Sequence, residues 1–270
     1  MPEDTSLTRR LSSPVRRLVR RVLATADLKL VPTEGGTEHD VSPEDAEILR
    51  DVAPYTMTTP ASVVALVSAV RHVSAAGIPG AIVETGVWRG GSMRAVARTL
   101  RELDRQDVPL YLFDTFEGMV APTDKDVAWT GESAEDLMRT ETGKRAELLW
   151  ARAPLDEVRR VLAETGYPAE LLHFVIGLVE ETIPEQAPDQ IALLRLDTDW
   201  YASSKHELEH LYPRLSPGGI LILDDYAWWD GVRMATDEYF AAHPPKPWLV
   251  RLDDSGARVA VKPGPVGRFD

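Results

Sequence analysis

The sequence contains no cysteine. Disulfide bonds, thiolate nucleophiles and thiolate metal sites are therefore excluded. Basic residues are in the minority, with 30 Lys and Arg against 43 Asp and Glu and a formal net charge of −13. Proteins that bind nucleic acid in general are basic, so no nucleic-acid partner is expected. No apolar run approaches the roughly 20 residues of a membrane span, and the N-terminus lacks the apolar segment of a signal peptide. These absences predict a cytoplasmic protein without a membrane partner.

The 270 residues suffice for one large domain with an additional arm. Residues 1–21 contain six arginines against two acids, and apolar residues recur at helical spacing between 15 and 23. Such a helix could lie on a membrane surface or act as an organelle presequence. We favour docking on an acidic body or on a second subunit. The sequence thus predicts an arm over residues 1–50, a main domain over residues 51–270, and a homo-oligomer.

From residue 81 onward, strand-like and helix-like segments alternate. This order is typical of an α/β fold with a mostly parallel sheet and helices on both faces. We expect Pro217, Gly218 and Gly219 to form a turn before a strand, and residues 247–252 and 257–262 to form a closing hairpin. Strands are expected at 81–83, 110–113, 172–176, 191–196 and 220–223, and helices at 43–53, 60–72, 92–103, 155–165, 201–213 and 231–242.

Residues 117–150 interrupt this alternation. The segment is acidic, contains three glycines, and connects two units of the expected sheet. A connection of this length inside a compact domain is usually functional or disordered. We interpret residues 117–150, named the lid segment below, as a partly helical cover over the site.

Carboxylates follow two of the expected strands. Asp197 and Asp199 come after the apolar run 191–194, and Asp224 and Asp225 come after the run 220–223. Ligands of α/β sheets bind beyond the carboxyl ends of parallel strands. Four neighbouring carboxylates repel one another unless a cation lies among them, which favours a divalent metal with oxygen ligands. The alternative is that these aspartates cap the helices that follow.

A glycine turn after the first strand indicates a small-molecule site. The run from Glu84 through Gly86 to Ser92 joins a strand to a helix, and glycines there allow close approach of a ligand. It is not the GxGxxG pattern of dinucleotide sites. Its acidic strand end suits a cationic amino group, and Asp114 ends the second strand, where an acid binds ribose hydroxyls. S-adenosylmethionine fits both requirements.

Six motifs in order resemble the macrocin O-methyltransferase family (TylF/MycF-like), which methylates sugar hydroxyls of antibiotics. The resemblance covers roughly residues 50–262. It implies a class I methyltransferase fold with a Rossmann-like seven-stranded sheet, S-adenosylmethionine and Mg²⁺. The motifs are Tyr55–Met57, Val83–Gly91, Phe113–Gly118, Arg195–Tyr201, Leu215–Gly219 and Asp224–Tyr226.

The resemblance also implies roles for single residues. Asp197, Asp224 and Asp225 correspond to the metal ligands. Because the carboxylates lie beside the expected cofactor site, we also expect Asp197 to be the catalytic group that takes the acceptor's proton. Asp199 is expected to support the ligands or to cap the next helix. The positions that resemble cofactor contacts are Thr56, Met57, Glu84, Gly86, Ser92, Asp114, Thr115, Phe116, Val179 and Glu180.

Four aromatic residues near the acidic clusters are candidates for substrate contact: Tyr201, Tyr226, Trp228 and Trp229. Their rings could equally pack against the core, and for the two tryptophans the sequence favours neither interpretation. The expected reaction is Mg²⁺-dependent methylation of a deoxysugar hydroxyl, on a glycosylated natural product or on a nucleotide sugar. Methylation of a catechol or other phenolic diol is the alternative, and a non-catalytic protein that binds S-adenosylmethionine is a third possibility.

Overall fold

The computed structural model describes residues 41–264. The basic arm expected at the N-terminus lies almost wholly outside the described residues. Helix α3 (Pro43–Val52), which was expected to belong to the arm, packs through Ile48 and Val52 against the next two helices. The compact unit therefore begins at residue 41, before the boundary expected at residue 51. No helix among the described residues is long and apolar enough to cross a bilayer.

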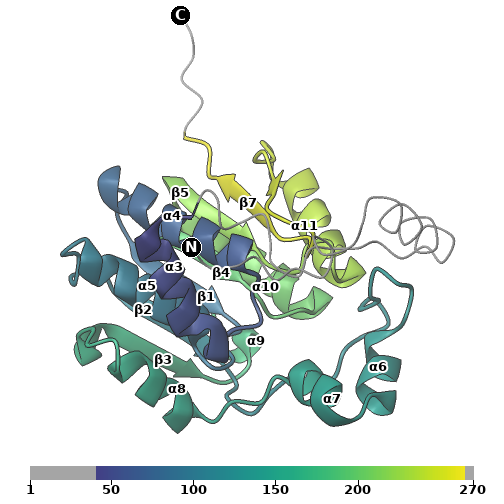
Figure 1. The fold of residues 1–270 in the computed structure, drawn as a ribbon. Helices are drawn as coiled ribbons and strands as arrows, with labels where there is room; N and C mark the ends of the chain where they lie inside the picture. The colour runs from purple at the N-terminus through teal and green to yellow at the C-terminus, as the bar shows by residue number, and fades with distance from the viewer. Residues whose placement is uncertain (1–40, 265–270) are drawn as a thin grey trace, which may run out of the picture. The chain divides into compact units, whose positions relative to one another are not determined.

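Seven strands form one sheet in the order β3-β2-β1-β4-β5-β7-β6 (Figure 1). Neighbouring strands from β3 to β5 are parallel, whereas β7 is antiparallel to both β5 and β6. Strands β1 and β4 are buried along their whole length, as expected when helices cover both faces of a parallel sheet. The strands are β1 (Ala81–Thr85), β2 (Leu110–Asp114), β3 (Leu172–Ile176), β4 (Ile191–Leu196), β5 (Leu215–Leu223), β6 (Val250–Arg251) and β7 (Arg258–Val261).

Two helical layers cover the sheet and bury two separate apolar clusters. Helices α4, α5 and α8 contribute to the cluster on one face, and α9, α10 and α11 contribute to the cluster on the other. The α/β fold predicted from alternation is thereby confirmed. The helices are α4 (Pro60–Ala75), α5 (Gly91–Glu102), α6 (Ala134–Thr140), α7 (Gly143–Trp150), α8 (Leu155–Ala163), α9 (Val179–Thr182), α10 (Tyr201–His210) and α11 (Asp230–Ala242), with 3₁₀ turns η1 (Ala53–Tyr55), η2 (Ala169–Leu171) and η3 (Tyr212–Arg214).

The turn expected at Pro217–Gly219 is wrong, because β5 begins at Leu215 and runs through it. The register with β4 is irregular here, because Ile191 pairs with Leu215 whereas Leu193 pairs with Ile220. Lys262 pairs with both glycines, since its carbonyl accepts from Gly218 N and its amide donates to Gly219 O. A proline-glycine run usually indicates a turn, but here pairing with Lys262, directly after β7, keeps the run in the sheet.

The lid segment contains helices α6 and α7 and has an apolar cluster of its own. Figure 1 shows these two helices apart from the layers that cover the sheet. The segment is attached by a bridge between Ala128 and Trp229 and by a hydrogen bond from Trp200 Nε1 to Val120 O at 3.0 Å. Its cluster combines Ala128, Ala134, Leu137 and Met138 with Trp200, Trp229 and Val232.

Candidate functional site

Residues at the carboxyl ends of β1, β2, β4 and β5 line one cavity of about 670 Å³. The turn that follows α3 and the lid segment complete its wall. This is the edge where ligands of parallel sheets bind, and the volume is ample for a drug-sized molecule. The cavity therefore contains both places at which the sequence predicts ligands.

Asp114 fixes the turn between β1 and α5. Its Oδ2 accepts hydrogen bonds from the amides of Val87 at 2.7 Å and Trp88 at 2.9 Å, and its Oδ1 accepts from Phe116 N at 2.7 Å. A carboxylate offers about four lone-pair positions, so one acceptor position remains for a ribose hydroxyl. Asp114 thus shapes the glycine turn and keeps the capacity to bind a ligand.

Gly86 brings this turn against the loop after β4. Its φ is +78°, and a Cβ at this position would lie 2.0 Å from the carbonyl oxygen of Asp197. Only glycine permits so close an approach. Nearby, α5 begins after Gly90 without a side-chain cap, and Gly91 and Ser92 line the cavity. The uncapped first turn of this helix is suited to an anionic group such as a carboxylate.

Eight of the ten expected cofactor residues line the cavity, and two do not. Phe116 is buried in the core, near Phe174. Glu84 is buried behind the cavity wall, where enclosure raises its pKa to about 7 although Arg195 opposes the shift. Its Oε2 has no hydrogen-bond partner among the described residues. The eight that line the cavity are Thr56, Met57, Gly86, Ser92, Asp114, Thr115, Val179 and Glu180.

Arg195, to which the sequence assigned no role, connects four segments around the cavity. Its side chain is 3% exposed and contacts Glu84 Oε1 at 2.6 Å, Asp197 Oδ2 at 2.7 Å, Asp224 Oδ1 at 2.8 Å and Thr58 Oγ1 at 2.9 Å. Breaking such a buried charge network is costly, because the remaining partners lose their neutralisation. A sequence signal exists: Arg195 is the one charged residue in the apolar strand β4, which is covered on both faces.

The aspartates form a cluster beside Arg195. Carboxylate oxygens of Asp197, Asp199 and Asp225 all lie within 4.8 Å of one another. Asp224 turns toward Arg195 instead, and because that contact is not aligned as a hydrogen bond, its buried Oδ1 has no hydrogen-bond partner among the described residues.

Enclosure by the protein and mutual repulsion hold the pKa of Asp197 and of Asp225 well above the usual range. Enclosure also raises the pKa of Asp199 to about 7. A divalent cation relieves this kind of electrostatic strain, since it favours the ionised form of every carboxylate around it.

A buried glutamate supports the loop that carries Asp197 and Asp199. Thr198, between these two residues, donates through Oγ1 to Glu207 Oε1 on α10 at 2.9 Å, and lies 2.9 Å from Ser203 Oγ. Glu207 is fully buried, and burial raises its pKa to about 8. The sequence did not indicate this role, because Glu207 looks like an ordinary charged residue of a surface helix.

The four aromatic candidates separate into three environments. Trp229 also lines the cavity, but it is 4% exposed and packs edge-on against Trp200, with ring centroids 5.1 Å apart. Trp228 is 44% exposed and lines the cavity. Tyr201 and Tyr226 are not among the lining residues, and their hydroxyls donate to Glu238 and Asp237 on α11. Trp228 is therefore the candidate best placed to contact a substrate.

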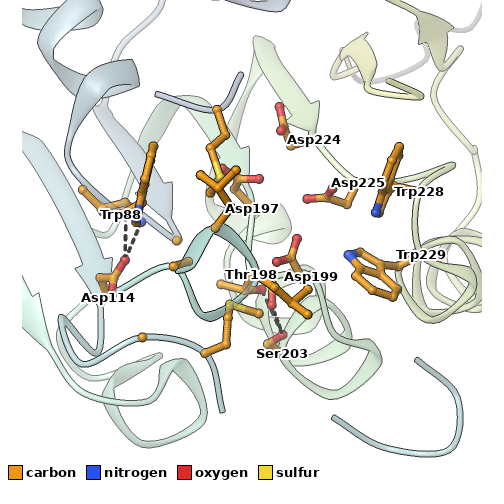
Figure 2. Close-up of a pocket in the computed structure, with 18 of the residues that line it drawn as sticks. Trp88, Asp114, Asp197, Thr198, Asp199, Ser203, Asp224, Asp225, Trp228 and Trp229 are labelled. Atoms are coloured by element: carbon orange, nitrogen blue, oxygen red, sulfur yellow. Dashed lines mark hydrogen bonds between the residues drawn. The ribbon is translucent and has the colours of Figure 1, made fainter. Parts of the chain in front are cut away.

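Figure 2 shows the order of these groups across the cavity. Asp114 and Trp88 lie on one side, Trp228 and Trp229 lie on the other, and Asp197, Asp199 and Asp225 lie between them. The acidic cluster thus separates the expected cofactor side from an aromatic side.

Comparison with known proteins shows which proteins the chain resembles. The chain is 35% identical over 190 residues to the 8-demethyl-8-(2,3-dimethoxy-alpha-L-rhamnosyl)-tetracenomycin-C 4'-O-methyltransferase of Streptomyces olivaceus, covering 69% of this chain and 68% of the relative. It is 32% identical over 180 residues to the mycinamicin III 3''-O-methyltransferase of Micromonospora griseorubida, covering 67% and 68%. The solved structure of the O-methyltransferase NovP superposes with a TM-score of 0.68 at 29% identity, covering 78% of this chain and 83% of that one.

The fold is that of the class I methyltransferases, as the sequence motifs predict. The family model described as macrocin-O-methyltransferase (TylF) matches residues 17–259, which is most of the chain. The chain is therefore an O-methyltransferase and belongs to the macrocin O-methyltransferase (TylF) family.

Proposed function

We propose that this enzyme transfers the methyl group of S-adenosylmethionine to a hydroxyl of a deoxysugar in secondary metabolism, with the help of a divalent cation such as Mg²⁺. The observation that carries the proposal is the aspartate cluster between the two sides of a single cavity. The name of one relative supports the choice of acceptor, because it describes a 4'-O-methyltransferase of a rhamnosyl-tetracenomycin C.

The cofactor side fits S-adenosylmethionine in three respects. Asp114 retains an acceptor position for a ribose hydroxyl. The uncapped start of α5 suits the carboxylate of the methionine moiety. Glu180 adds a negative charge to a wall that faces a cationic sulfonium ligand.

The donor set also fits a hard divalent cation, which prefers carboxylate oxygens. Asp197, Asp224 and Asp225 would hold it: carboxylate oxygens of Asp197 and Asp225 lie within 4.8 Å of each other, and Asp224, whose Oδ1 contacts Arg195, would contribute its other oxygen. Asp199 would keep Asp225 in position through a hydrogen bond between the two side chains. When bound, such a cation lowers the pKa of a chelated hydroxyl and aligns its oxygen for attack.

Different residues of the chain would then have different roles in methyl transfer. The acceptor oxygen forms a bond to the methyl carbon as the carbon–sulfur bond breaks, and Asp197 takes the hydroxyl proton. Arg195 holds Asp197 and Asp224 in place from behind. Glu207 and Thr198 keep the loop between Asp197 and Asp199 in position from α10.

The decisive experiment uses labelled S-adenosylmethionine with glycosylated natural products, nucleotide deoxysugars and catechols as acceptors, in Mg²⁺ and in EDTA. We expect transfer to a sugar that EDTA abolishes. Asp197→Asn should remove turnover while the cofactor still binds, as measured by calorimetry. Transfer that survives complete removal of metal, or near-normal turnover of the variant, contradicts the proposal, and transfer to catechols alone selects the other acceptor class.

A matched pair of substitutions tests whether Asp224 or Asp199 is the third metal ligand, beside Asp197 and Asp225. We expect Asp224→Asn to weaken Mg²⁺ affinity at least about tenfold and Asp199→Asn to weaken it less, because a residue that supports a ligand matters less than the ligand. Titration of Mg²⁺ into the cofactor complex measures both. The reverse order would assign the ligand role to Asp199.

A further inference from the structure

We infer that Asp126 of the lid segment is a positioning residue for the proposed cation site, because it fixes the loop that carries Asp197 and Asp199. In this arrangement the cation binds tightly only while the lid segment is attached. The inference rests on the proposed function and adds a residue that is not part of the cavity wall but on which the affinity for the cation depends.

The loop between β4 and α10 contains a strained turn. The amide of Trp200 donates to the carbonyl oxygen of Thr198 at 2.8 Å, and Asp199 between them has a φ of +67°. A three-residue turn with a positive φ at its centre is the rare and strained form of the γ-turn. Such a conformation persists only where its surroundings hold it. The positions of Asp199 and of nearby Asp197 therefore depend on the contacts that hold this turn.

Asp126 holds the end of the turn from the lid segment. Helix α10 begins at Tyr201, and its N-terminal flanking residue Trp200 provides no side-chain cap. Instead, Oδ1 of Asp126, 75 positions away in the sequence, accepts a hydrogen bond from Tyr201 N at 2.7 Å. A carboxylate suits this place, because the first N–H groups of a helix lack backbone partners and carry partial positive charge. The lid segment thus supplies the cap that α10 lacks.

The other contacts of Asp126 lie within the lid segment. The residue is fully buried, and its Oδ2 accepts from the amide of Thr123 at 2.7 Å and from the hydroxyl of Thr123 at 2.8 Å. Its carbonyl oxygen accepts from Ala134 N at 2.8 Å. A buried carboxylate is costly unless its oxygens are hydrogen-bonded, and here one oxygen is satisfied by the lid segment and the other by Tyr201. Attachment of the lid segment and capping of α10 are therefore one event.

Contacts from α10 hold only the first half of the turn. Glu207 accepts from Thr198 Oγ1 at 2.9 Å, whereas the lid segment holds the two residues after Asp199. Detachment of the lid segment would release this second half, and the carboxylate oxygens of the aspartate cluster would no longer be kept within 4.8 Å. The effect is mutual, because a cation that prefers the attached state stabilises attachment by the same factor.

Titration of Mg²⁺ into the complex with S-adenosylhomocysteine tests the inference in two variants. Asp126→Asn cannot accept from both Tyr201 N and Thr123, because one of its two terminal atoms becomes a donor. Gly231→Ala keeps the carboxylate but adds a Cβ that would overlap its Oδ1. We expect each variant to weaken Mg²⁺ binding about tenfold and to leave the affinity for S-adenosylhomocysteine unchanged. Asp124→Asn, at an exposed aspartate of the same loop, is the matched control and should keep the wild-type Mg²⁺ affinity.

Hydrogen exchange of the wild type tests the mutual effect without any substitution. Saturating Mg²⁺ should slow exchange about tenfold at residues 120–134 and at Tyr201, and it should leave strands β1 and β4 unchanged. This slowing should be absent in Asp126→Asn. The wild-type measurement decides the question even if both variants fail to fold.

Other outcomes overturn the inference in distinguishable ways. Equal Mg²⁺ affinity in Asp126→Asn, Asp124→Asn and the wild type would show that Asp126 serves stability alone, and the proposed function would stand. A parallel loss of Mg²⁺ and S-adenosylhomocysteine affinity would indicate a general loosening of the fold and has the same meaning, as does exchange of the lid segment that does not respond to Mg²⁺. If the wild type binds no Mg²⁺, the metal-dependent part of the proposed function fails and the inference fails with it.

Discussion

At the scale of single residues, burial controls the charge of the carboxylates around the cavity. Glu84, Asp199 and Glu207 all have pKa values raised by enclosure, but their surroundings differ. Glu84 has the guanidinium of Arg195, Asp199 faces other aspartates, and Glu207 is hydrogen-bonded by the hydroxyl of Thr198, with the like charge of Glu180 raising its pKa further. A cation can therefore ionise the aspartates, whereas Glu207 stays protonated near neutral pH.

Glu207→Gln tests this difference through the pH dependence of stability. The pKa of Glu207 rises from 4.5 in the unfolded chain to about 8 in the folded one. Protonated Glu207 therefore contributes to the free energy of unfolding. This contribution is fully present below the pKa of the unfolded chain and is lost as the pH rises toward the pKa of the folded chain. Glutamine keeps the acceptor for Thr198 without this loss. Urea unfolding should show the variant gaining more than about 1 kcal/mol on the wild type between about pH 5 and about pH 8. A pH-independent difference contradicts the assignment.

At the scale of elements, the site depends on the contact between the turn after β1 and the loop after β4. Gly86 allows this contact. Gly86→Ala should destabilise the fold by about 1–3 kcal/mol more than Gly131→Ala, because overpacking against backbone is added to backbone strain. Both glycines have positive φ, but a Cβ at Gly131 meets nothing within 4 Å. Thermal unfolding and Mg²⁺ titration of both variants measure the effect, and equal behaviour would show that the contact does not matter.

The lid segment depends on Trp200 in a comparable way. The Trp200 side chain is buried in the lid cluster, next to Val232 of α11. Its ring nitrogen donates a hydrogen bond to the carbonyl oxygen of Val120. Trp200→Ala should destabilise the attachment of the lid segment by about 3–5 kcal/mol, because it removes both the packing and the hydrogen bond. Hydrogen exchange should rise at residues 120–140 while strands β1 and β4 stay protected. Exchange that rises equally in the strands would show that the lid is not a separate unit.

The sequence allows prediction of the strands and of the acidic clusters, but not of their side-chain arrangement. Apolar runs, glycine turns and acids at strand ends are local signals, and they place Asp114, Asp197 and Asp225 at one edge. Which of Asp199 and Asp224 turns toward Arg195 depends on packing between separate strands. The hydrogen bond between Asp126 and Tyr201 joins distant segments, so no local pattern indicates it.

At the scale of the whole molecule, a net charge of −13 and five aspartates in one cavity would make binding of the proposed cation sensitive to pH. The raised pKa of Asp197, Asp199 and Asp225 means that protons compete with the cation as the pH falls. The apparent dissociation constant for Mg²⁺ should rise at least about tenfold from about pH 8 to about pH 6. Calorimetric titration measures it, with S-adenosylhomocysteine affinity as the control. A constant Mg²⁺ affinity over this range would contradict the protonation of the cluster.

The apolar cluster of the lid segment shares no residue with the two clusters on the faces of the sheet. Substitutions within helices α6 and α7 should therefore disturb the sheet and its helices less than substitutions at Trp200, Trp229 and Val232, which join the lid cluster to the starts of α10 and α11. If the proposed function holds, the wall that would face the acceptor can be changed by mutation while the residues proposed for methyl transfer stay the same. Exchange of residues 119–150 between relatives, together with the loop at 228–229, is thus a rational route to enzymes with new acceptors.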